Sequence, residues 1–182
     1  MNKETSDMLE VRITEEMKTR AKDKARKLQG AYGDHGTHRI DSTRRRMTGF
    51  AAEEAIKQAY PILTPSLDVS VDFRLGKYTF DVKSQGCNKP PQGNYSATLY
   101  EEQRLRAATY YIFCRTKNDL STVWICGAIS KHRFFDLALL KEKGTSAGNF
   151  IYDNTRYELS YDQLTDVNVV LDALLKRRKK NG

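Results

Sequence analysis

The chain has 182 residues, of which 39% are apolar and 30% charged, and its net charge is +8. This length suffices for one domain with a sizeable core, and the ten Tyr and seven Phe exclude a globally disordered chain. No apolar run approaches the roughly 20 residues that a membrane span needs, so we expect no membrane partner, whereas the basic balance favours a polyanionic partner such as nucleic acid.

The cysteines and the N-terminus predict a compartment. Cys87, Cys114 and Cys126 are far apart, odd in number and form no CxxC pair, which argues against a structural zinc site. The N-terminus is charged from Lys3 onward, unlike a signal peptide. We therefore expect reduced thiols and a cytoplasmic location, in the host if the chain is phage-encoded.

Residues 1–42 are predicted to be a basic N-terminal helix and loop appended to the core. Residues 12–29 read as a charged helix with one thin apolar stripe, made of Ile13, Met17, Ala21, Ala25 and Leu28. We favour a solvated arm with a narrow docking face over a DNA-contacting arm. Residues 30–42 hold three glycines and predict a loop.

The remaining elements alternate between helices and strands. Helices are expected near 43–60, 97–108, 131–143 and 164–178, and strands near 69–75, 78–85, 109–115, 122–129, 149–152 and 155–159. This order predicts an α/β fold with a mixed central β-sheet flanked by helices. Residues 1–182 are expected to form a single domain with a core at 43–140, followed at 141–182 by a hairpin and a basic helix.

The stretch from Val69 to Gln85 predicts a hairpin with two distinct faces. A two-residue turn at Gly76-Lys77 places Asp72 opposite Asp81, with Cβ atoms about 5 Å apart. One face is apolar (Val71, Phe73, Leu75, Tyr78, Phe80, Val82) and the other polar (Ser70, Asp72, Arg74, Thr79, Asp81, Lys83, Gln85). Opposed carboxylates repel, and a bound Mg²⁺ would offset that repulsion. The alternative is a pair of solvated residues on an exposed sheet face.

Asp72 followed by Asp81-Val82-Lys83 resembles the D…(D/E)xK signature of the PD-(D/E)xK nuclease superfamily, in particular its small phage and restriction-type members. The helix TGFAAEEAIKQAY at 48–60 is similar to the family's G-x-x-x-E helix, with Glu53 as its acidic residue and Glu54 as second choice. The later strands and the helix start at 131–135 extend the resemblance over roughly residues 43–140. The proline that often precedes the first aspartate is replaced here by Val71.

The resemblance implies a restriction-endonuclease-like αβββαβ core and a metal-dependent nuclease, in particular an endonuclease, that hydrolyses DNA phosphodiester bonds. Asp72, Asp81 and the carbonyl of Val82 would bind Mg²⁺ or Mn²⁺, and Glu53 would bind a water of that ion or help hold a second ion. Lys83 would orient or deprotonate the attacking water, and Gln85, on the same face, would position the water or the phosphate.

Several residues are candidates for nucleic-acid contacts. Arg44, Arg45 and Arg46 precede the Glu53 helix and could bind phosphate, although a charged helix start is the plainer alternative. Lys89 and Tyr95 lie in or beside the loop after the hairpin, where Tyr95 could stack on a base. The C-terminal basic run at 176–180 suits either a helix end or a nucleic-acid tail.

Two further functions stay open at this stage, a non-catalytic nucleic-acid-binding module on the same fold and an exonuclease. An intact Asp72, Asp81 and Lys83 set favours catalysis. Because duplex cutters often need two active sites, a homodimer is also considered. The sequence does not distinguish DNA from RNA, or duplex from single-stranded or branched substrates.

Overall fold

The computed structural model describes residues 8–31, 39–147 and 150–180. Its helices are α1 (Glu15–Ala31), α2 (Arg39–Ala59), α3 (Lys131–Leu137) and α4 (Val167–Lys180), with 3₁₀-helices η2 (Glu101–Leu105) and η3 (Tyr161–Gln163). Its strands are β1 (Leu9–Arg12), β2 (Thr64–Pro65), β3 (Phe73–Leu75), β4 (Tyr78–Cys87), β5 (Ser96–Tyr100), β6 (Tyr110–Lys117), β7 (Thr122–Ser130), β8 (Leu139–Lys141), β9 (Ser146–Ala147), β10 (Phe150–Ile151) and β11 (Arg156–Ser160).

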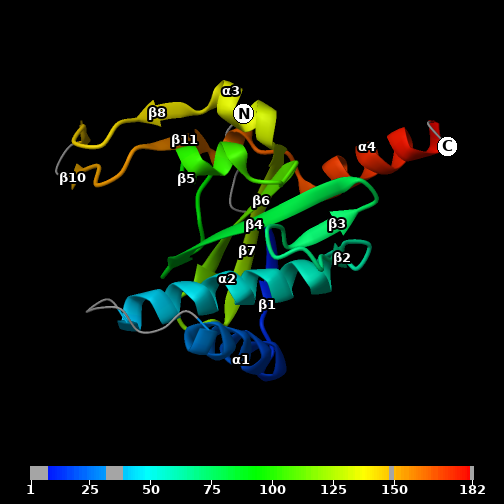
Figure 1. The fold of residues 1–182 in the computed structure, drawn as a ribbon, viewed down its shortest axis with the longest axis horizontal. Coiled ribbons are helices and arrows are strands. Elements are labelled where there is room, and N and C mark those ends of the chain that lie inside the picture. The colour runs from blue at the N-terminus through cyan, green and yellow to red at the C-terminus, as the bar shows by residue number, and fades with distance from the viewer. Residues whose placement is uncertain (1–7, 32–38, 148–149, 181–182) are drawn as a thin grey trace.

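A six-stranded sheet in the order β1-β7-β6-β4-β3-β2 forms the centre of the molecule (Figure 1). β4 pairs with β6 in parallel, whereas the other pairs in this sheet are antiparallel. The strands with the strongest apolar content, β6 and β7, are buried along most of their length. The expected mixed α/β fold with a mixed central sheet is therefore confirmed.

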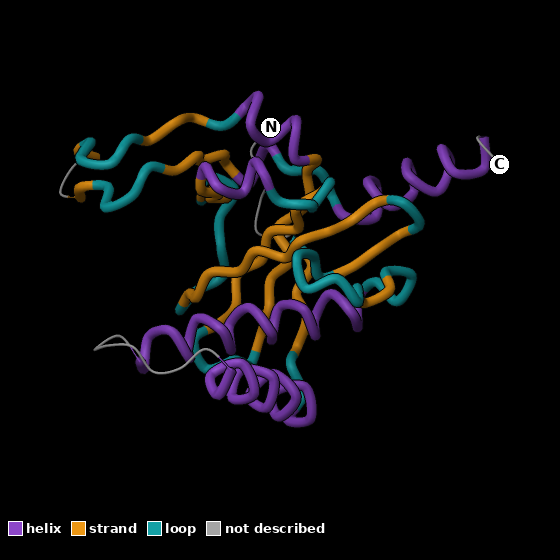
Figure 2. The backbone as a smooth tube through the Cα atoms, in the orientation of Figure 1, coloured by secondary structure: helices purple, strands orange, loops and turns teal. Residues whose placement is uncertain are grey.

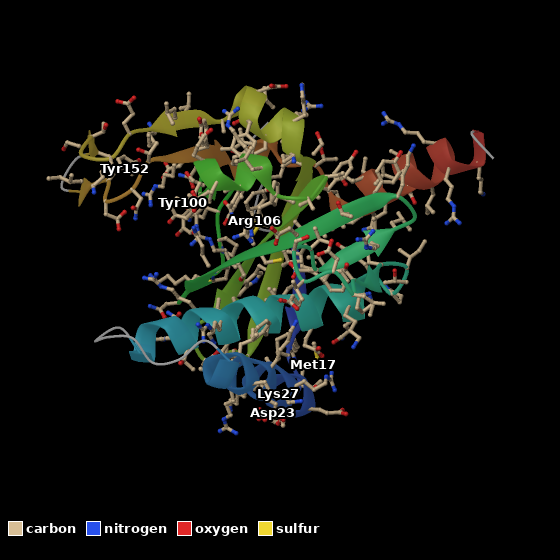
Figure 3. The ribbon with its side chains drawn as sticks, in the orientation of Figure 1. Met17, Asp23, Lys27, Tyr100, Arg106 and Tyr152 are labelled. Atoms are coloured by element: carbon tan, nitrogen blue, oxygen red, sulfur yellow. The ribbon has the colours of Figure 1, made fainter. Side chains whose placement is uncertain are left out.

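One face of the sheet is covered by helices, and we call it the helical face (Figure 2). α2 lies directly on it through Ala52, Ala55 and Ile56, which share a core with Phe80 and Ile112. α1 packs beside α2, and the predicted stripe on α1 supplies the contact, since Met17, Ala21 and Ala25 are buried. Asp23 and Lys27 lie on the outer side of α1 (Figure 3).

The opposite face is covered mainly by a second, three-stranded sheet in the order β5-β11-β8 and by α3. We call this the small-sheet face. Leu99 of β5 and Leu159 of β11 are buried against Tyr111 and Phe113 of the central sheet, and the Phe134 ring of α3 stacks on Phe113 at 5.6 Å between centroids. The central sheet thus has an apolar core on each side.

The expected helix at 97–108 is wrong, because this segment forms β5 followed by the short helix η2. The alternation in SATLY buries Ala97 and Leu99 and leaves Tyr100 exposed, as in a half-buried strand. β5 pairs with β11, more than fifty residues away in the chain, over its full length. This non-local pairing makes Ser96–Tyr100 a strand, and the Glu and Gln residues that follow form only the short 3₁₀-helix η2.

The C-terminal hairpin expected from the sequence is also wrong. β10 pairs with β9, and β11 pairs with β5 and β8, so the strands near 149–152 and 155–159 are not partners. The helix expected at 131–143 ends at Leu137, where the chain turns into β8. The expected final helix, 164–178, is α4, which begins at Val167.

At the N-terminus, β1 was not expected, and it extends the central sheet by pairing with β7. The predicted loop at 30–42 is shorter than expected, because α1 continues to Ala31 and α2 begins at Arg39. Residues 32–38 of that loop lie outside the described residues.

Within the part of the chain that the structure describes, no helix has the length and apolar character needed to cross a membrane. Cys87, Cys114 and Cys126 are all free thiols, and the last two are buried. The cysteines therefore contribute to packing as small apolar side chains.

Candidate active site on the β3–β4 hairpin

The β3–β4 turn has the register expected from the sequence. Leu75 pairs with Tyr78 and Phe73 with Phe80, around the two-residue turn Gly76-Lys77. Gly76 has a φ of 58°, a left-handed conformation that glycine adopts without steric cost and that matches a turn with glycine first. Continued by one residue, this register sets Asp72 across from Asp81.

The first strand is shorter than expected, since β3 begins at Phe73 instead of residue 69. Val71 was expected on the same apolar face as Phe73, but this is wrong. Val71 packs in the core of the small-sheet face, whereas Phe73 packs on the helical face. The chain before Phe73 leaves the strand pairing and turns across the sheet edge, which frees the edge of β4 beside Val82.

Asp72 occupies this freed edge and is held there by three hydrogen bonds. Its backbone N–H donates to Phe80 O at 2.9 Å, and its carbonyl accepts from Ser66 N at 2.9 Å. Its side-chain Oδ2 accepts from the backbone N–H of Val82 at 2.7 Å. The carboxylate takes the place of a strand partner for β4, so its position is fixed by the backbone on both sides.

Asp81 and Lys83 form an ion pair on the small-sheet face of β4. Lys83 Nζ lies 2.7 Å from Asp81 Oδ2, and the Lys83 ammonium lies 5.8 Å from the centre of the Tyr111 ring. Asp81 is only 6% exposed, so it is not the solvated surface residue of the alternative interpretation. Oδ2 receives no hydrogen bond of good geometry from any described residue, because the Lys83 contact is close but poorly aligned.

The two glutamates of α2 have different surroundings. Glu53 Oε2 forms a short ion pair with Lys24 of α1, whose ammonium also lies 4.4 Å from the centre of the Phe50 ring. Glu54 Oε2 accepts a hydrogen bond from Arg20 Nε at 2.6 Å. The charge of Glu53 contributes, after burial, to the raised pKa of Asp72, so the two carboxylates interact electrostatically.

The environment raises the pKa of two of these acids. Burial, followed by the charge of Glu53, raises the pKa of Asp72 to about 7, while the hydrogen bond from Val82 opposes the shift and Asp81 adds to it. Burial is also the main reason that the pKa of Glu53 is raised, with Lys24 opposing and Asp81 adding. Both groups are more easily protonated than free carboxylates, mainly because they are buried and also because other carboxylates lie near them.

The chemistry of the donor set fits a divalent cation. Glu53, Asp72 and Asp81 bring three carboxylates to the site, whereas Lys24 and Lys83 bring two ammonium groups in direct contact with it. Val82 donates its N–H to Asp72, and its carbonyl lies on the same strand edge, since both groups of a strand residue point the same way. Mg²⁺ is bound in proteins by one or two carboxylates plus waters.

No set of three or more His, Cys, Asp or Glu side chains among the described residues converges closely enough to form a metal centre by side chains alone. The fit therefore rests on the Asp72 and Asp81 carboxylates with the Val82 carbonyl. Glu53 is held by its ion pair with Lys24.

A cleft of about 670 Å³ begins at Lys83 and runs between α2 and the small sheet. Of the residues expected to contact nucleic acid, Arg44 and Arg45 line it, and Gln85 lines its floor. Arg46, Lys89 and Tyr95 are not among its lining residues. The Tyr95 ring instead lies 5.5 Å from the guanidinium of Arg115.

Several site residues were not expected from the sequence. Lys24 and Arg20 contact the α2 glutamates from a helix distant in the chain, and no local pattern marks them. Ser96, Thr98 and Tyr100 also line the cleft, and their alternation with Ala97 and Leu99 is a signal that could have identified β5.

Comparisons of the chain with models of protein families, with curated proteins and with solved structures found no match.

Proposed function

We propose that this chain is a metal-dependent nuclease of the PD-(D/E)xK type that hydrolyses DNA phosphodiester bonds, and that it acts as an endonuclease. The observation that carries the proposal is the ion pair on β4 between buried Asp81 and partly exposed Lys83, with Asp72 fixed beside it by the Val82 N–H. Burying the Asp81 carboxylate, whose Oδ2 lacks a well-aligned hydrogen bond, costs free energy of folding. A purely structural role therefore does not explain why this ion pair is present.

Asp72, Asp81 and the Val82 carbonyl are the residues that would hold Mg²⁺ or Mn²⁺. When bound, such an ion lowers the pKa of a coordinated water and neutralises charge on the phosphate. Asp72 and Asp81 keep the donor oxygens fixed, because one is bonded to the backbone and the other is buried. Glu53 stays close enough to influence the charge of Asp72 and accepts a hydrogen bond from a bound water.

Lys83 is the group that acts on the reacting phosphate. Its side chain is 23% exposed, contacts Asp81 and lines the cleft. There it orients the attacking water and stabilises negative charge that develops on the phosphate oxygens. Gln85 is exposed one step further along the same face of β4 and offers an amide to the phosphate or the water.

The restriction-endonuclease-like core belongs to the same proposal. The sequence order α2, β3, β4, β6, β7 and α3 supports it, with α2 packed on β4 and with β4 parallel to β6. The strand β5 stands where a helix was expected between β4 and β6. The proposed core therefore differs from the expected αβββαβ order at this connection.

The proposal is tested by incubating the wild-type chain with supercoiled plasmid, linear duplex and single-stranded oligonucleotides in Mg²⁺, in Mn²⁺ and in EDTA. We expect cleavage with either ion and none with EDTA, and loss of cleavage in Asp81→Asn. Closed circular substrates distinguish an endonuclease from an exonuclease, because only the former cuts a molecule without ends. Binding of DNA without cleavage under any condition would instead support the non-catalytic binding module.

A further inference from the structure

The cleft beside Lys83 has two walls and a floor built by different parts of the chain. One wall is the N-terminal part of α2, with Arg44, Arg45 and Thr48, and the floor is the end of β4, with Ser84, Gln85 and Gly86. The other wall is the small sheet and the turn before β11, which lie across from α2 (Figure 1). The cleft therefore adjoins the proposed site through Lys83, the ion-pair partner of Asp81.

The small-sheet wall is polar because of strand alternation. Ser96, Thr98 and Tyr100 of β5 line the cleft, whereas Ala97 and Leu99 between them are buried in the core. Tyr100 is 37% exposed, and its backbone N–H donates to Gln103 Oε1 at 2.8 Å, which fixes the end of the strand. The wall thus offers hydroxyl groups and one accessible aromatic ring in a row.

Arg156 of β11 is the cross-strand partner of Tyr100, so the two side chains lie on the same face of the small sheet. Its Nε lies 2.9 Å from Glu158 Oε1, and its guanidinium lies 4.4 Å from the centre of the Tyr152 ring. Tyr152 and Tyr100 both belong to the small-sheet side of the molecule (Figure 3). The guanidinium is therefore held in place before any ligand arrives.

The charge of the cleft suits a phosphate backbone. Among the lining residues that the structure describes, Arg44, Arg45, Arg156 and Lys83 carry positive charge, whereas Asp153 carries negative charge. A positive groove with aromatic rings along it is the usual arrangement for binding single-stranded nucleic acid. The arginines would contact phosphates, and the Tyr100 ring would stack on a base.

The size of the cleft is compatible with an unpaired segment of nucleic acid. Its volume of about 670 Å³ is within the range of sites that enclose one small molecule. Such a space accommodates a nucleotide or two with the bases turned out of a helix.

From these observations we infer that the cleft binds an unpaired DNA strand and leads it to Lys83, so that the substrate is single-stranded or has an unpaired segment at the cut. This inference rests on the proposed nuclease function and names its substrate class. Tyr100 is the stacking residue, and Arg44 and Arg45 are the phosphate contacts on the opposite wall.

The test measures binding of fluorescently labelled single-stranded and duplex oligonucleotides of one sequence, in EDTA so that no hydrolysis occurs. We expect wild type to bind the single strand more tightly than the duplex. Tyr100→Leu should weaken single-strand binding about 5- to 150-fold, since stacking on one base is lost, and Tyr100→Phe should restore it. The double variant Arg44→Gln/Arg45→Gln should make the fall of log K with log salt less steep. The magnitude of the slope should decrease by about 1.4, or about 0.7 for each lost phosphate contact.

Arg26→Gln is the control for a lost charge, because it removes one positive charge, half of what the double variant removes, from the exposed surface of α1, where Arg26 pairs with Asp23. Thermal melting of every variant verifies that it folds. Equal single-strand binding by wild type, Tyr100→Leu and the double arginine variant would overturn the inference, as would tighter binding of the duplex. If binding follows the prediction but no substrate is cut in Mg²⁺, the cleft assignment holds and the nuclease proposal alone fails.

Discussion

The Asp72 carboxylate is bonded to the backbone of Val82, with 2.7 Å between Asp72 Oδ2 and the Val82 nitrogen. This contact forms because β3 begins at Phe73 instead of residue 69, which leaves the N–H of Val82 without a strand partner. It fixes Asp72 next to Asp81 on a sheet edge instead of on a regular hairpin face. The donors proposed for a cation are thereby rigid before a cation binds.

Divalent ions are expected to stabilise the folded protein through Asp72. At a free ion concentration 100 times the dissociation constant, the gain is about 2.7 kcal/mol, which raises the melting temperature of a protein of this size by about 5–11 °C. Thermal melting with and without Mn²⁺ measures it. Asp72→Asn should lose most of the increase, whereas Asp136→Asn, an exposed carboxylate on α3, should keep it. Equal increases in both variants would exclude Asp72 as a ligand.

The stability of the metal-free protein should fall as the pH rises from about 4 to about 7. The pKa of Asp72 is 3.8 in its ordinary state and about 7 in the folded protein. Between these values the folded state binds more protons than the unfolded state, so the free energy of unfolding decreases with pH, by at most about 4 kcal/mol for this group. Urea unfolding across this range measures the decrease, and Asp72→Asn should flatten it. A wild-type stability that rises with pH through this window would contradict the assignment.

Glu53 and Glu54 should differ in their effects on cleavage. Glu53→Gln is expected to lower the cleavage rate about 10- to 100-fold. This is the usual effect of losing a residue that hydrogen-bonds to the groups bound to a metal. Glu54→Gln should leave the rate close to wild type and cost at most about 1 kcal/mol of stability, because it breaks only the partly exposed contact with Arg20. Rates of oligonucleotide cleavage and urea unfolding measure the two effects. The reverse order would identify Glu54 as the functional residue.

Two glycines test the backbone geometry of the site. Gly76→Ala should destabilise the protein by about 1–2 kcal/mol, because its φ of 58° is unfavourable for a residue with a Cβ atom. Gly49→Ala lies inside α2, where a Cβ meets no heavy atom within 4 Å, and should stabilise by about 0.4–1 kcal/mol. Chemical denaturation of both variants provides the comparison. Similar changes in both would contradict the turn assigned at Gly76-Lys77.

The elements that could be predicted from the sequence are those with strong local patterns. The Leu75–Tyr78 register follows from the alternation around Gly76, and β6 and β7 follow from their apolar runs. The expected pairing of Asp72 with Asp81 depends only on that short hairpin. These features are local, so no knowledge of distant contacts is needed to expect them.

The features that were missed depend on contacts between distant segments. β5 becomes a strand through its pairing with β11, and β1 through its pairing with β7. Lys24 reaches Glu53 because α1 packs on α2, which a short apolar stripe on α1 indicates only in outline. The cleft itself needs α2, β4 and the small sheet together, so its lining could not be derived from any one segment.

The central claim is that Lys83 acts in phosphodiester hydrolysis, and the most direct test compares two lysines of the same hairpin. Lys83 contacts Asp81, whereas Lys77 is exposed in the turn, 5.6 Å from the centre of the Tyr78 ring. Cleavage of a labelled DNA substrate in Mg²⁺ or Mn²⁺ is measured for wild type, Lys83→Ala and Lys77→Ala. We predict at least about a 100-fold slower rate for Lys83→Ala and a rate near wild type for Lys77→Ala. Equal rates in the two variants would contradict the proposed role of Lys83.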